Sequence, residues 1–137
     1  MKIKLDNGAI MPTYAHDDDA GMDLYTPADA DVFPGGCVTI DTGVHVQIPH
    51  GMFGKLESKS GLNVRNHIVS CGGVIDSGYN GSIKVQLYNL GRFPHHFRAG
   101  DKIVQMIVQP YKHESFELVD ELEDTERGDN GFGSTGR

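Results

Sequence analysis

Positive charge is scarce in this chain of 137 residues, which has 12 lysines and arginines against 19 aspartates and glutamates and a formal net charge of −7. A protein that holds the backbone of DNA or RNA needs a broad basic surface. The sequence therefore argues against a nucleic-acid partner. An anionic small molecule would need a local group of cations and backbone N–H donors.

Long apolar runs are also missing from the chain. No segment approaches the length that crosses a bilayer, and the first residues, MKIKLDNG, contain no sustained apolar stretch. We therefore expect a cytoplasmic protein with no membrane partner.

Cysteine is rare, since the chain has only Cys37 and Cys71, and neither has a Cys or His partner at the spacing of a metal site. A chain of this length builds a hydrophobic core without disulfides, so both are predicted to be small core residues. The acidic run 17–19 lacks the rest of a calcium-binding loop, and the seven histidines are scattered. We assign no metal to protein side chains.

The chain does contain alternation with a period of two, which is typical of half-buried strands. Apolar and polar residues alternate over 44–48 and 83–88, and further apolar segments at 52–57, 67–75 and 102–110 are bounded by Gly, Pro, Asn or Asp. Turn signals recur about every ten residues, which favours one all-β domain, a barrel or a sandwich.

The segment 103–108 is apolar on both faces apart from Gln105. This pattern predicts a strand buried on both sides, for which a subunit interface could supply the second layer. One short helix is predicted over 60–66, with Ser60 as its cap.

The dipeptide Asn80-Gly81 predicts a type I′ hairpin turn, because both central residues of that turn need a positive φ. Asp76 and Tyr79 would then lie at the head of a hairpin. A carboxylate held rigidly there could orient and deprotonate a water molecule. The alternative is an aspartate that bonds to the backbone of its own turn.

The composition changes near the C-terminal end. Residues 120–126 are acidic, and 127–137 have four glycines and no strand or helix pattern. We predict a single β domain over 1–120 and a flexible arm over 121–137.

The glycine spacing at 131–136 matches a dinucleotide-binding string but lacks the strand before it and the helix after it that such a site needs. The arm still carries Arg127, Phe132 and Ser134, which offer a cation, a stacking ring and a hydroxyl to a polyphosphate ligand. The alternative is a solubilising tail.

Five segments in order resemble the five motifs of the homotrimeric dUTPases, the dUTP pyrophosphatases. They are AGMDLY at 20–25, SKSGL at 58–62, GVIDSGYNG at 73–81, GDKIVQMI at 100–107 and the glycine-rich segment 127–136. The resemblance spans nearly the whole chain, and the third segment is its most diagnostic part.

The resemblance implies a distorted jelly-roll or β-barrel-like subunit with one short helix and a flexible C-terminal arm. Three such subunits would form a homotrimer with active sites at the subunit boundaries. The implied reaction is Mg²⁺-dependent hydrolysis of dUTP to dUMP and pyrophosphate, which keeps uracil out of DNA and supplies dUMP for thymidylate synthesis. The Mg²⁺ would be held mainly by the triphosphate and water.

By the same resemblance, Asp76 would be the catalytic residue that orients the attacking water. Tyr79 would lie under the deoxyribose and exclude a 2′-OH, and Phe132 would stack on uracil when the arm closes. The implied substrate-binding residues are Lys59, Ser60, Gly61, Ser70, Val74, Ile75, Tyr79, Lys84, Gln105, Arg127, Phe132, Gly133 and Ser134, with Asp23 in a supporting role near the water shell of the metal.

The chain departs from the family pattern at three positions. Lys59 replaces the usual Arg and lacks its planar fork, Ser70 replaces an Asn that contacts the base, and Asn130 replaces one Gly of the arm. Two alternatives stay open: a dCTP deaminase of the same fold, and a regulatory trimer that binds nucleotide without hydrolysing it.

Overall fold

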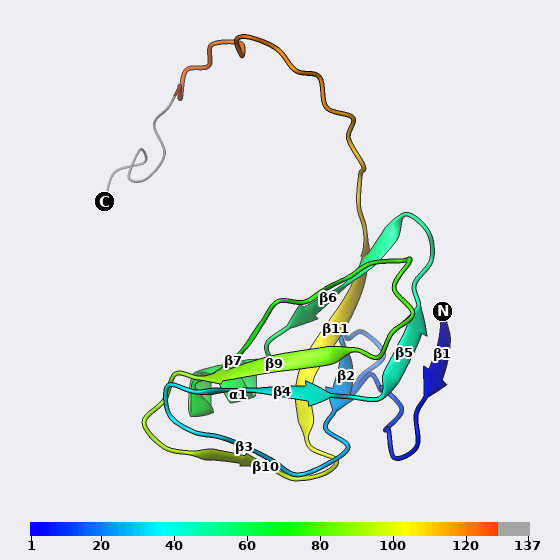
Figure 1. Cartoon of the computed structure of the whole chain (residues 1–137), viewed down its shortest axis with the longest axis vertical. Coiled ribbons are helices and arrows are strands. Elements are labelled where there is room, and N and C mark those ends of the chain that lie inside the picture. The colour runs from blue at the N-terminus through cyan, green and yellow to red at the C-terminus, as the bar shows by residue number, and fades with distance from the viewer. Residues whose placement is uncertain (129–137) are drawn as a thin grey trace.

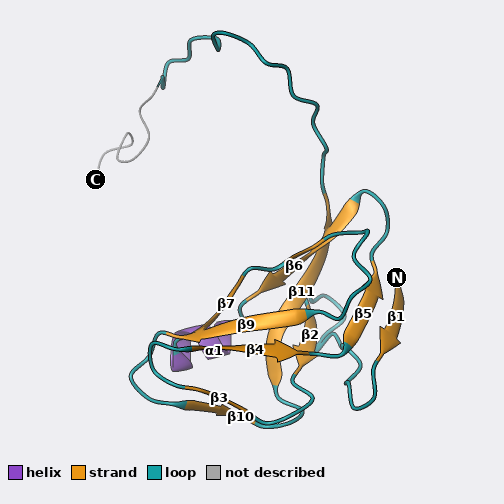
Figure 2. Ribbon diagram, viewed as in Figure 1, coloured by secondary structure: helices purple, strands orange, loops and turns teal. Residues whose placement is uncertain are grey.

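Antiparallel strands dominate the structure. The computed structural model describes residues 1–128, which form eleven strands and one helix (Figures 1 and 2). The elements are β1 (Lys2–Leu5), β2 (Met22–Tyr25), β3 (Ala30–Val32), β4 (Cys37–Asp41), β5 (Val44–Gln47), β6 (Met52–Glu57), α1 (Ser60–Asn66), β7 (Ile68–Cys71), β8 (Val74–Ile75), β9 (Lys84–Asn89), β10 (His95–Phe97) and β11 (Lys102–Pro110).

The strands of residues 1–128 form four antiparallel groups: β2-β11-β6-β8, β4-β9-β7, β1-β5 and β10-β3. One core joins the groups, because Leu24 and Val104 from the first group and Val85 and Leu87 from the second are fully buried in a single cluster. The prediction of an all-β fold with a single short helix is confirmed.

The alternation in the sequence explains which side chains enter this core. On β5, Val44 and Val46 are buried while His45 and Gln47 face outward. On β11, Met106 is buried but Ile107 and Val108 are only partly covered. The expected burial of this strand on both sides is therefore complete only toward its N-terminal half.

The expected burial of the two cysteines is wrong, since both thiols are exposed. On β4 the inward positions belong to Val38 and Ile40, so the period of two turns Cys37 outward. Cys71 ends β7 and lies opposite Gln86 of β9, whose side-chain amide donates to the Cys37 sulfur at 3.7 Å. The two thiols therefore share the outer face of this sheet.

The expected hairpin at Asn80-Gly81 is also wrong. Neither residue has a positive φ, and the turn lies earlier, where the Tyr79 N–H donates to the Asp76 carbonyl at 3.0 Å. The flanking strands do not pair, because β8 binds β6 while β9 binds β4 and β7. Gly81 is needed for space, since a Cβ there would lie 2.8 Å from Cε2 of the Tyr79 ring.

The helix has the expected bounds, but its cap differs. Lys59 occupies the N-cap position without a side-chain cap, and Ser60 is the first helical residue. The helix ends at Asn66, and the next residue, His67, has a left-handed φ of 56°. The strand expected over 67–75 is divided into β7 and β8 because Gly72 and Gly73 have φ values of 76° and 130°.

The last strand ends at Pro110, and residues 111–128 run away from the sheets without helix or strand (Figure 1). The boundary predicted at residue 120 stays a prediction. No helix among residues 1–128 is long and apolar enough to cross a membrane.

Candidate active site

A buried carboxylate is the centre of the first group of predicted site residues. Asp23 on β2 is 4% exposed, and it accepts hydrogen bonds from Lys59, just before α1, and from Lys102 on β11, the latter at 2.7 Å. Burial raises the pKa of Asp23, but the hydrogen bonds from Lys102 and Lys59 outweigh it and hold the pKa below its ordinary value. Asp23 is therefore ionised and fully paired.

Gln105 lies next to this ion group, because the register of β11 places it opposite Asp23 on one side and Glu57 on the other. Its side-chain amide donates to the Ser58 carbonyl at 3.4 Å. A Cβ at Gly21 would come within 2.6 Å of the Gln105 side-chain oxygen. The glycine of the first motif thus leaves room for the glutamine of the fourth.

Two serines connect this group to β7. The Ser70 N–H donates to the Ser58 hydroxyl oxygen at 2.9 Å, and the two hydroxyls lie 3.1 Å apart. Ser60 and Gly61 begin α1 directly after Lys59, and a Cβ at Gly61 would meet nothing within 4 Å. The structure therefore gathers Asp23 with the predicted residues of the second and fourth motifs.

The second group of predicted residues follows β8. Val74 and Asp76 are exposed and line an open hollow of about 420 Å³ together with Phe53, Tyr111 and His113. The Asp76 carboxylate has no hydrogen-bond or ion-pair partner within residues 1–128. Within these residues the Asp76 carboxylate therefore does not bond to the backbone of its own turn, which was the alternative interpretation.

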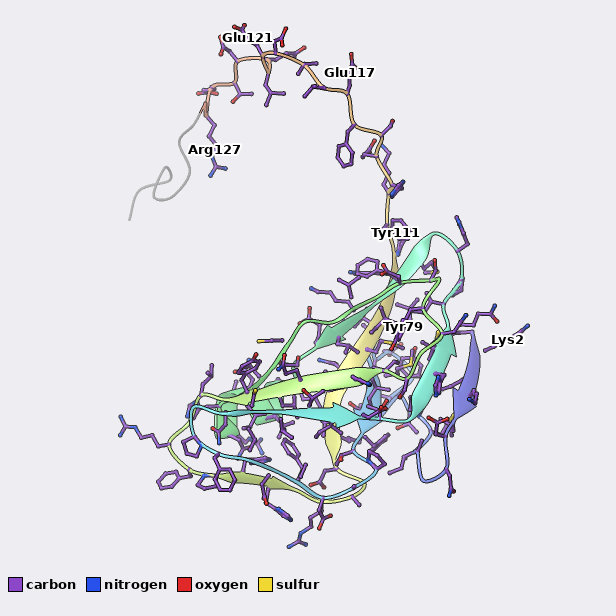
Figure 3. The ribbon with its side chains drawn as sticks, viewed as in Figure 1. Lys2, Tyr79, Tyr111, Glu117, Glu121 and Arg127 are labelled. Atoms are coloured by element: carbon purple, nitrogen blue, oxygen red, sulfur yellow. The ribbon has the colours of Figure 1, made fainter. Side chains whose placement is uncertain are left out.

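Tyr79 lies on the loop between this hollow and β9 (Figure 3). Its hydroxyl donates to the Ser82 carbonyl at 2.9 Å, and the ring is 42% exposed. The Ser82 hydroxyl donates in turn to Asp41, whose other carboxylate oxygen lies 4.0 Å from Nζ of Lys84. A chain of polar contacts thus runs from Tyr79 through Ser82 and Asp41 to Lys84, the predicted base-reading residue at the start of β9.

The two groups are neighbours along β6 but do not touch through their polar side chains. The Leu56 N–H donates to the Gly73 carbonyl at 2.8 Å, which ties the start of β8 to β6. Within residues 1–128, no hydrogen bond or ion pair of a side chain connects Asp76 to Lys59 or Gln105.

The arm residues are placed only in part. Arg127 lies on the extended segment beyond β11 (Figure 3), while Phe132, Gly133 and Ser134 lie outside the described residues. The sequence interpretation missed Lys102 and Ser58, although both stand inside the matched motifs. Because their partners come from distant strands, alternation along one strand could not reveal them.

Comparisons with known proteins identify the family. The dUTPase family model matches residues 7–136. The deoxyuridine 5'-triphosphate nucleotidohydrolase of Cutibacterium acnes is 46% identical over 129 residues, which cover 92% of this chain and 85% of that protein.

Two solved structures are similar over most of both chains. The dUTPase of Staphylococcus bacteriophage 80alpha, solved with dUpNHpp, has a TM-score of 0.88 and 30% identity over 99% of this chain and 98% of its own. A dUTPase variant from phage phi11 of S. aureus, which coordinates a structural Mg(II) ion, has a TM-score of 0.82 and 26% identity over 90% of this chain and 98% of its own. The shared fold and the match along nearly the whole sequence show that this chain belongs to the dUTPase family.

Proposed function

We propose that this protein hydrolyses dUTP to dUMP and pyrophosphate by attack of water on the α-phosphorus. The observation that carries the proposal is the unpartnered Asp76 carboxylate at the edge of an open hollow, three residues after the start of the third motif. A carboxylate with no internal partner is available to accept a proton from water in the transition state.

Tyr79 supports the choice of a deoxynucleotide. Its ring lies where a Cβ at Gly81 would clash with it, and its hydroxyl is bonded to Ser82, so its position is fixed without a ligand. A sugar placed on such a ring has no room for an added 2′-OH. The strands on the two sides of this loop carry Val74 and Ile75 on β8 and Lys84 on β9. These residues would read the uracil edge through backbone and side-chain groups.

The phosphates would be held by the group around Ser60, Gly61 and Gln105, completed by Arg127 and Ser134 of the arm. Lys59 forms an ion pair with Asp23 in this structure, so its charge is balanced before substrate binds. Lys59 and Asp23 would therefore set the positions of the first helical residues rather than bind phosphate by themselves.

The residues present fit a Mg²⁺ that is bound mainly by substrate. Within residues 1–128 no group of three or more His, Cys, Asp or Glu could hold a metal ion, and both oxygens of Asp23 are taken by lysines. When bound, the ion would neutralise charge on the phosphate oxygens. Water near Asp23 would be the contact of this chain with the ion.

The separation of the two groups supports a homotrimer with sites at subunit boundaries. Within residues 1–128 of one chain, no side-chain hydrogen bond or ion pair joins Asp76 to the group around Gln105, so a second copy would supply the missing side of each site. The half-buried Ile107 and Val108 offer apolar surface for that contact.

A product assay with Mg²⁺ tests the function. The protein is offered dUTP, dTTP, UTP and dCTP separately, and the products are resolved by ion-exchange chromatography. We expect rapid formation of dUMP and pyrophosphate from dUTP and far slower hydrolysis of UTP, dTTP and dCTP. Formation of dUTP or dUMP from dCTP would show deaminase chemistry, and binding of dUTP without any turnover would show a regulatory protein.

A further inference from the structure

His45 connects the loop that carries Tyr79 to the body of the protein. It lies on β5, outside the five matched motifs. Its Nδ1 lies 2.9 Å from the Asn80 carbonyl oxygen, and its Nε2 lies 3.0 Å from the Asp6 carboxylate. The ring therefore spans from the residue next to Tyr79 to the segment after β1.

The two contacts together define the protonation state of the ring. A carbonyl and a carboxylate both accept hydrogen bonds, so both ring nitrogens must carry a proton for both bonds to exist. The hydrogen bond to Asp6 and then the bond to the Asn80 carbonyl raise the pKa of His45, against a smaller opposing effect of desolvation. A neutral ring keeps only one of the two bonds.

The other charges around His45 are few. Lys4 lies directly opposite it on β1 and is 3.6 Å from the second oxygen of Asp6, and Lys2 lines the same shallow hollow. The pKa of Asp41 lies below its ordinary value because the Ser82 hydroxyl and the Gly43 N–H bond to it, and the charge of Asp6 opposes this only weakly. Asp6 is thus the only anion bonded to the His45 ring among residues 1–128.

The other hydrogen bonds that hold the loop 76–83 lie nearer its two ends, whereas His45 binds its centre at Asn80. The Tyr79 N–H bonds to Asp76, and beyond the loop the Ile83 N–H donates to the Val44 carbonyl at 2.9 Å. Ser82 is bonded to Asp41. Between them, His45 is the side chain that binds Asn80, so it sets how far this part of the loop lies from β5.

We propose that His45, as an imidazolium bridging Asp6 and the Asn80 carbonyl, is a positioning residue that fixes Tyr79 against the sugar and so sharpens the preference for dUTP over UTP. This inference rests on the proposed function. His45 touches no substrate, and its effect passes through the peptide that joins Asn80 to Tyr79.

The first test compares kcat/KM for dUTP and for UTP between about pH 6 and about pH 9. Both substrates carry the same triphosphate, so its titration cancels in the ratio. In the unaltered protein the ratio falls as pH rises through the raised pKa of His45. In His45→Ala the ratio is about tenfold lower at the acidic end and no longer changes with pH.

Two matched variants sharpen this test. His45→Gln keeps one side-chain donor that does not titrate, so its ratio should lie between those of His45→Ala and the unaltered protein and should be flat with pH. His50→Gln changes an exposed histidine with no partner within residues 1–128 and should behave as the unaltered protein. A ratio in His45→Ala equal to that of His50→Gln would overturn the proposal.

A second test needs no turnover. In the isotope-labelled protein without nucleotide, the His45 ring and the amides of Asn80 and Gly81 should titrate by NMR with one shared midpoint above 6.5, and Asp6→Asn should lower it. If the protein hydrolyses dUTP but the His45 ring titrates independently of the Asn80 and Gly81 amides, the positioning role is overturned. Shared titration in a protein that leaves dUTP intact would instead refute the proposed function.

Discussion

Asp23 shows how a buried charge is tolerated in this fold. Its carboxylate is nearly inaccessible, yet two lysines from separate strands or loops bind its two oxygens. Burying a carboxylate without such partners would cost several kcal/mol. Because Lys59 precedes α1 and Lys102 begins β11, this one residue fixes the start of the helix relative to the central sheet.

Asp23→Asn should destabilise the protein by about 1–3 kcal/mol at neutral pH, because it removes the charge that pairs with both lysines. The loss stays in this range since both lysines are partly exposed and can bind water instead. The folded-state pKa of Asp23 lies below its ordinary value of 3.8, so its stabilisation is present above that pH and is lost as pH falls through the folded pKa. Urea unfolding at several pH values should show a shallower acid dependence in the variant.

Asp18→Asn is the control for this measurement, because Asp18 is exposed and has no partner within residues 1–128. It should leave both the stability and its pH dependence unchanged. Equal acid profiles for Asp23→Asn and Asp18→Asn would contradict the role given to the ion group.

Asp76→Asn should keep the fold and nucleotide binding but lower kcat by about 10²–10⁴-fold, because the amide cannot accept the proton of the attacking water. Circular dichroism and binding of a non-hydrolysed analogue check the first part, and product formation checks the second. Asp17→Asn, an exposed acidic position far from the third motif in sequence, serves as the control. Near-normal turnover in Asp76→Asn would remove the residue from its role.

At the scale of elements, two glycines decide where the third motif lies. Gly72 and Gly73 both have positive φ, and a Cβ at Gly73 would lie 2.8 Å from that of Leu56. They bend the chain from β7 in one sheet to β8 in the other. Asp76 consequently emerges beside β6 and Tyr111 rather than beside β9.

Gly73→Ala should therefore lower the free energy of unfolding by about 1–3 kcal/mol, from backbone strain and from the close approach to Leu56. Gly78→Ala is the matched control, since Gly78 has no positive φ and a Cβ there would meet nothing within 4 Å. Urea midpoints are compared at equal protein concentration. Identical midpoints for the two variants would show that the bend is not strained.

At the scale of the whole molecule, apolar side chains beyond β11 are left uncovered in a single chain. Phe116 and Leu118 are almost fully exposed, and Leu122 is 87% exposed. Val74 at the edge of the hollow is also exposed. Apolar surface of this kind marks contacts with further copies or ligands, which agrees with the proposed trimer and the proposed closure of the arm.

Removal of residues 127–137 should leave the assembly intact but impair hydrolysis of dUTP. Light scattering should give three times 15.0 kDa for the full chain and a correspondingly reduced trimer mass for the truncated one. The arm would exclude water and add Arg127 and Ser134 to the phosphates, so kcat/KM should fall. An unchanged rate in the truncated protein would refute the arm as a lid.

The sequence by itself determined the strands over 52–57 and 102–110, the helix over 60–66, and the order of the five motifs. These features are local, because alternation and helix bounds follow from backbone geometry within a few residues. The family resemblance likewise rests on short segments, and the comparisons confirm it.

The tertiary structure alone decided which distant residues meet. Neither the pairing of Asp23 with Lys59 and Lys102, nor the bridge from His45 to Asn80, could be predicted from alternation. Each depends on the register between strands far apart in the chain, and a shift of one residue in that register turns every side chain to the opposite face.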